Sequence, residues 1–71
     1  MLHYMTTTKR DREYRLWYGV AAMQGERVEQ RLDGLTMDSG SIRQLVQRLN
    51  EGHASLLHFA EITEDFLAHP L

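Results

Sequence analysis

A chain of 71 residues forms one domain near the lower size limit for independent folding, so its apolar core is small. Eight basic and ten acidic residues leave a net charge of −2, and the absence of cysteine excludes disulfides, thiolate catalysis and cysteine-based zinc sites. The sequence shows neither a signal peptide nor an apolar stretch near the ~20 residues that cross a bilayer, so we expect a cytoplasmic protein without membrane contact.

The charges are unevenly distributed along the chain. All eight basic residues lie at or before Arg48, together with six acids, whereas the segment from Leu49 onward holds four acids and no Lys or Arg. The two parts therefore carry +2 and −4. Such asymmetry can steer two copies toward each other, although a balanced solvent-exposed surface is the simpler interpretation.

Residues 1–12 allow two interpretations. Leu2, Tyr4 and Thr6 alternate with their neighbours, and tyrosine and the threonine run favour extended structure. The charged segment 9–12 then marks a turn or the end of a tail. We therefore expect either an N-terminal edge strand or a flexible tail.

Residues 13–23 predict the main strand, because they are rich in aromatic and β-branched side chains and contain no proline. Gln24-Gly25 predicts a short turn, and residues 26–33 alternate like a half-solvated antiparallel strand. The strand 13–23 is apolar on both faces, so its register against the strand 26–33 decides which of its faces meets the helices. A two-residue loop turns Trp17 and Ala21 toward the helices, whereas a bulge exchanges the faces.

Two helices follow the predicted hairpin. Ile42, Leu45, Val46 and Leu49 recur at helical spacing, and either Asp38 or Ser41 serves as the N-cap of a helix that ends near Asn50. The second helix is predicted from Leu56 to about Ala68. Its predicted cap and stop signals are Ser55 and Pro70, and its apolar face contains Phe59, Ile62 and Phe66.

The sequence thus predicts a single α+β domain over residues 1–71. An antiparallel sheet of two or three strands is followed by two antiparallel helices that pack on one face of the sheet.

Several segments resemble a family of short uncharacterised bacterial proteins. The segments are Tyr18-Gly19-Val20, Leu35-Thr36 with Asp38, and the helix 58–67, of which Glu64-Asp65-Phe66-Leu67 is the most specific part. Glu61 stands where the family pattern has aspartate, and Ile62-Thr63 where it has two valines. The resemblance covers about three-quarters of the chain and implies the same order of elements and a bacterial cytoplasmic origin, but no activity.

No catalytic, cofactor-binding or metal-binding residue is predicted. His58, Glu61 and Asp65 share one side of the second helix, but they offer three ligands where a structural zinc site needs about four. Ser39-Gly40-Ser41 lacks the Gly-Lys-Ser/Thr ending of a phosphate-binding P-loop. Because no activated nucleophile is evident either, we expect no enzymatic activity and no cofactor.

A protein-interaction module is the leading functional prediction. Tyrosine and tryptophan are enriched at interfaces, and a strand that is apolar on both faces keeps one face for a partner. We therefore expect a homodimer, or a complex with an unidentified protein partner, through the strand face. The predicted interface residues are Tyr14, Leu16, Trp17, Tyr18 and Val20.

The alternative is weak nucleic-acid binding by the N-terminal segment. Lys9, Arg10, Arg12 and Arg15 surround aromatic side chains that can stack on bases. The overall acidity and the acidic C-terminal helix argue against this alternative, because both repel a polyanion.

Overall fold

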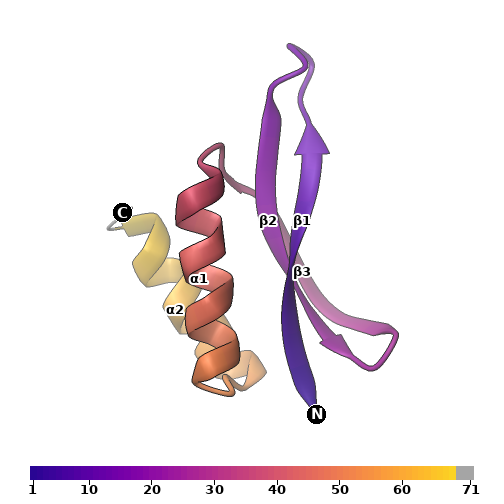
Figure 1. The fold of residues 1–71 in the computed structure, drawn as a ribbon, viewed down its shortest axis with the longest axis vertical. Helices are drawn as coiled ribbons and strands as arrows, with labels where there is room; N and C mark the ends of the chain where they lie inside the picture. The colour runs from indigo at the N-terminus through magenta and orange to yellow at the C-terminus, as the bar shows by residue number, and fades with distance from the viewer. Residues whose placement is uncertain (69–71) are drawn as a thin grey trace.

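The computed structural model describes residues 1–68 and confirms the α+β fold, with a three-stranded antiparallel sheet followed by two helices (Figure 1). The elements are β1 (Leu2–Arg10), β2 (Leu16–Gln24), β3 (Arg27–Thr36), α1 (Ser39–Glu51) and α2 (Leu56–Ala68). The strand order is β1-β2-β3, and β1 pairs with β2 from Leu2 to Arg10. The N-terminal segment is therefore an edge strand.

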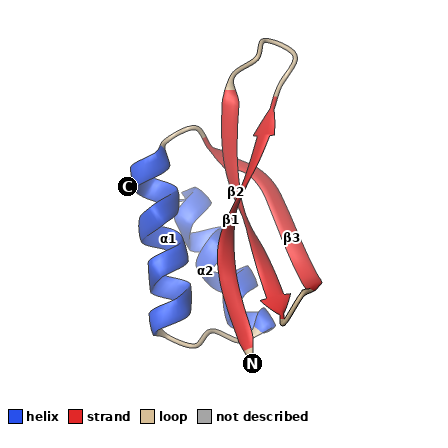
Figure 2. Cartoon of the chain, turned by 45° about the vertical axis from the view of Figure 1, so that its right-hand side comes forward, coloured by secondary structure: helices blue, strands red, loops and turns tan. Residues whose placement is uncertain are grey.

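Both helices lie on the same side of the sheet, and α2 runs back along α1 (Figures 1 and 2). The Asp38 carboxylate accepts a hydrogen bond from the backbone N–H of Ser41 at 2.7 Å, so Asp38 is the N-cap of α1 and the alternative start at Ser41 is wrong. The hydroxyl of Ser55 caps α2 by accepting from the N–H of His58 at 3.2 Å. The predicted stop at Pro70 lies outside the described residues.

A β-bulge decides which face of the sheet meets the helices. Gln24 pairs with Arg27 around a two-residue turn, one residue later than predicted, and Gly25 in this turn has a φ of +62°. The register then shifts between Ala22 and Met23, so that Val20 lies opposite Leu32. The exchanged arrangement is therefore the observed one: Tyr18, Val20 and Ala22 face the helices, and Trp17 and Ala21 face away.

The core lies between this face and the two helices. The predicted helical stripes are confirmed, since Ile42, Leu45 and Leu49 of α1 and Phe59 and Phe66 of α2 are buried. They pack with Val20, Ala22 and Tyr4 of the sheet. The rings of Tyr4 and Phe59 lie 5.1 Å apart and are tilted, an arrangement that aromatic pairs favour.

Asn50 ties the end of α1 to the outer edge of β1. Its side-chain oxygen accepts from the backbone N–H of Tyr4 at 2.8 Å, and its amide donates to the Tyr4 carbonyl at 2.9 Å. The amide therefore replaces one residue of a neighbouring strand and satisfies backbone groups that an edge strand leaves unpaired. The sequence indicated Asn50 only as a helix stop.

Candidate interaction surfaces

The face of the sheet opposite the helices is covered by no other element of the described chain (Figures 1 and 2). Side chains alternate between the two faces of a strand, so the odd-numbered residues of β1 and β2 lie on this open face. The register places them in four cross-strand rows, which are His3 with Met23 and Val28, Met5 with Ala21 and Arg31, Thr7 with Gly19, and Lys9 with Trp17.

The first two rows bring together a group of apolar side chains that we call the methionine patch: Met5, Ala21, Met23 and Val28. Met5 and Val28 are 47% and 50% exposed, and Met23 is half-buried. Ala21 is buried although it belongs to the open face. Methionine is flexible and polarisable, and it adapts to differently shaped partner surfaces.

A polar bridge over Gly19 separates this patch from the other end of the sheet. The Thr7 hydroxyl donates to the Asp33 carboxylate at 2.9 Å, across the central strand, and Arg31 donates to the same carboxylate at 2.8 Å. A Cβ at Gly19 would lie 2.7 Å from the Thr7 hydroxyl, so only glycine leaves room for the bridge. Hydrogen bonds from Arg31 and then Thr7 lower the pKa of Asp33.

Beyond the bridge, the end of β1 and the beginning of β2 extend past the helices as a projecting hairpin (Figures 1 and 2). We call residues 9–17 the arm. It contains four cations, two acids and two aromatic side chains. Tyr14 in its turn is 80% exposed and has a φ of 63°, a conformation that non-glycine residues rarely adopt.

Asp11 organises the arm by accepting hydrogen bonds from several donors. One carboxylate oxygen accepts from the backbone N–H groups of Glu13 and Arg15 at 2.8 and 3.0 Å. The other accepts from the Arg15 guanidinium at 2.8 Å and from the Trp17 indole N–H at 2.9 Å. These bonds, with that from Trp17 the largest influence, hold the pKa of Asp11 well below its usual range.

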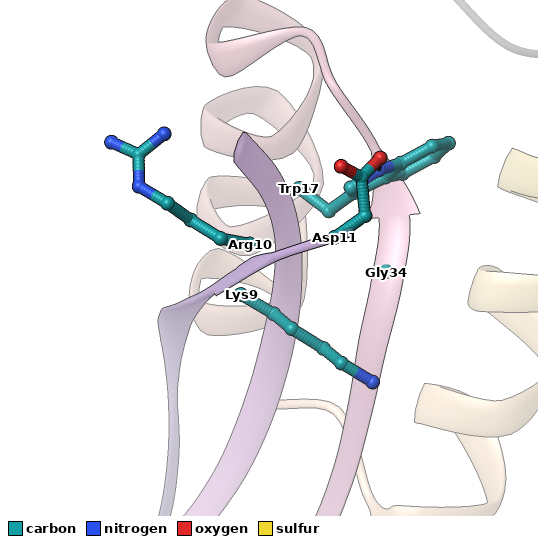
Figure 3. A pocket seen from close by; sticks show the side chains of 5 residues that line it. All are labelled: Lys9, Arg10, Asp11, Trp17 and Gly34. Atoms are coloured by element: carbon teal, nitrogen blue, oxygen red, sulfur yellow. Dashed lines mark hydrogen bonds between the residues drawn. The ribbon is translucent and has the colours of Figure 1, made fainter. Parts of the chain in front are cut away.

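A hollow of about 220 Å³ lies at the base of the arm, lined by Lys9, Arg10, Asp11, Trp17 and Gly34. In Figure 3, Lys9, Asp11 and Trp17 extend to one side of the ribbon, whereas the Arg10 side chain extends to the other. The Arg10 guanidinium instead donates to the Tyr14 carbonyl at 2.7 Å. The hollow therefore offers an aromatic ring and an ammonium group next to a carboxylate that is already hydrogen-bonded.

The structure does not bring the five predicted interface residues together. Tyr14, Leu16 and Trp17 belong to the arm, but Leu16 lies on the helix-facing side and Trp17 on the open side. Tyr18 is partly buried against the core on the helix-facing side, and Val20 is fully buried in the core, so Val20 is not available to a partner. The bulge explains this separation, because it turns the even-numbered residues of β2 toward the helices.

Sequence reasoning missed the methionine patch. Met5 and Met23 come from segments 18 residues apart, and only the pairing of β1 with β2 makes them neighbours. The signal available in advance was Met5 within an alternating N-terminal segment, but the two-face ambiguity of β2 hid its partners.

The candidate metal ligands on α2 do not form a site. Asp65 lies 4.0 Å from Arg48 of α1, as a weak ion pair on the surface. Among residues 1–68, no three histidine, cysteine or acidic side chains gather closely enough to hold a metal ion.

Comparison with family models, with curated proteins and with solved structures gives no match for this chain. The family resemblance therefore stays a prediction. Neither helix within residues 1–68 combines the length and hydropathy needed to span a membrane.

Proposed function

We propose that this protein is an interaction module that self-associates through the methionine patch. The observation that carries the proposal is the one-sided sheet: two helices cover one face, and the other face presents Met5, Met23 and Val28 to solvent. Exposed apolar side chains that cluster, rather than occurring singly, are typical of interaction surfaces.

A second copy of the chain is the partner that fits the patch best. In a two-fold dimer the same patch of each copy meets that of the other, so apolar side chains face apolar side chains across the interface. A domain of this size also gains stability from association, because its own core is small. Four side chains cover less than the ~800 Å² per partner of a standard interface, so we expect micromolar affinity.

The test is the solution mass, measured by light scattering at several micromolar concentrations. Met5→Glu and Val28→Glu place a charge in the patch without touching the core, and each is expected to convert the dimer to a monomer. Leu57→Glu is the matched control, because Leu57 is an exposed leucine on α2, and this variant should remain dimeric. A wild-type protein that stays monomeric throughout the range would refute the proposal.

A further inference from the structure

We propose that the arm binds single-stranded nucleic acid, with a base stacked on Trp17 in the hollow and phosphates held by Lys9 and Arg12. This function is separate from self-association, because the arm and the methionine patch lie at opposite ends of the open face. The polar bridge of Thr7, Asp33 and Arg31 stands between them.

The charge of the arm differs in sign from that of the remaining chain. With four cations and two acids the arm carries +2, so the other residues carry −4. Arg15 forms salt bridges with both acids of the arm: its guanidinium lies 2.8 Å from the Asp11 carboxylate and 3.6 Å from the Glu13 carboxylate. Lys9 and Arg12 form no salt bridge with any described residue, so their charges are available to a polyanion.

The position of the arm removes the objection raised by the acidic α2 helix. The arm projects past the ends of both helices, and the acids of α2 lie on the helix layer rather than on the arm (Figures 1 and 2). A strand that binds the arm can therefore approach from the open side of the sheet. Its phosphates then meet the basic residues before they meet the acidic surface.

The ring of Trp17 and the backbone of Tyr14 are held in place by hydrogen bonds within the arm. The indole N–H of Trp17 is fixed by Asp11, and the backbone of Tyr14 is fixed by hydrogen bonds to Asp11 and Arg10. Tyr14 is nevertheless largely exposed, so its ring contributes little to the core. The positioned and partly exposed ring of Trp17 makes a good stacking surface, since little entropy is lost when a base binds to it.

The hollow favours a single strand over a duplex. Its volume of about 220 Å³ is below the ~300–1,000 Å³ of typical small-molecule pockets, so it accommodates one ring rather than a large cofactor. A base reaches Trp17 only when it is unstacked, as in a single strand, because the bases of a duplex are stacked on each other. Lys9 then lies on the same side of the ribbon, where a flanking phosphate can reach it.

Trp17 is the only tryptophan in the chain, so intrinsic fluorescence reports directly on the hollow. We expect a thymidine oligonucleotide of about 12 residues to quench this fluorescence at low salt. Two phosphate contacts, to Lys9 and Arg12, predict that log K falls with log salt with a slope of about −1.4. A duplex of the same length should bind more weakly and leave the emission nearly unchanged.

Two charge substitutions on the arm identify the residues involved. Lys9→Ala and Arg12→Ala remove exposed cations that form no described salt bridge, so the fold is retained, and each should weaken binding about three- to tenfold. Arg43→Ala is the control: it removes the same charge from the exposed face of α1 and should change binding less than twofold. Trp17→Leu, followed with a labelled oligonucleotide, should weaken binding about tenfold or more through lost stacking.

Three results would overturn the inference: no salt-dependent binding at all, an equal loss for Arg43→Ala and Arg12→Ala, or a duplex that binds as tightly as the single strand. The Val28→Glu variant separates this inference from the proposed function. If that variant is monomeric and still quenches with the oligonucleotide, the arm acts independently. A loss of both dimer and binding in this variant would show instead that the arm has no binding site of its own.

Discussion

Replacement of Thr63 by valine should stabilise the protein. Thr63 lies on α2 with 3% of its surface exposed, and among the described residues its hydroxyl oxygen is the buried side-chain polar atom that has no hydrogen-bond partner. Burying a hydroxyl without a partner costs about 1–3 kcal/mol in proteins. Valine has the same shape, fills the same space and carries no polar group.

The size of the effect follows from these terms. Removing the unpaired hydroxyl recovers part of the cost of burying it. The methyl group that takes its place adds buried apolar surface worth up to ~0.8 kcal/mol. Threonine and valine have similar helix propensities, so the helix itself contributes little to the difference. We expect a gain of about 1–2 kcal/mol, which corresponds to a rise in Tm of about 5–15 °C for a domain of this size.

Thermal and urea unfolding followed by circular dichroism measure this gain. Thr63→Ser is the matched control, because it keeps the hydroxyl and removes the methyl group, and it should lower stability by about 1 kcal/mol. An unchanged or lower Tm for Thr63→Val would refute the reasoning, since it would mean that the hydroxyl makes a stabilising hydrogen bond in solution.

Three other predictions follow from the strand contacts and the arm. Gly19→Ala should destabilise the fold by about 1–3 kcal/mol in a urea titration, because the new Cβ clashes with the Leu32 carbonyl. Gly40→Ala in α1 should instead stabilise it by about 0.5–1 kcal/mol, because a Cβ there meets its neighbours at ordinary contact distance. Asn50→Ala should cost about 1–3 kcal/mol in the same assay by removing both bonds to the β1 backbone. Because the pKa of Asp11 is lower in the folded than in the unfolded state, its contribution is complete above the ordinary value of 3.8 and is lost as the pH falls below it. Tm should therefore drop in this acid range, and less steeply in Asp11→Asn; equal slopes would contradict the role of this carboxylate.

The sequence by itself determined the elements whose signal is local. The apolar stripe of α1 and the cap of α2 at Ser55 depend on residues within one or two helical turns, so spacing was enough to locate them. The cap of α1 was narrowed only to Asp38 or Ser41, and the structure shows Asp38. The order of strands and helices followed for the same reason. The N-terminal strand was ambiguous, because its short run of threonines favours extended structure only weakly, and an edge strand forms only when a neighbour pairs with it.

The tertiary structure alone decided which residues face a partner. A single extra residue at the β2–β3 bulge inverts every side chain of the central strand, and no propensity distinguishes the two registers. That inversion buried Val20 and turned Trp17 and Met23 to the open face, where the pairing of β1 with β2 brings Lys9 beside Trp17 and Met5 near Met23. Likewise, the pairing of Asn50 with Tyr4 joins positions 46 residues apart, and contacts at such a distance exist only once the chain has folded.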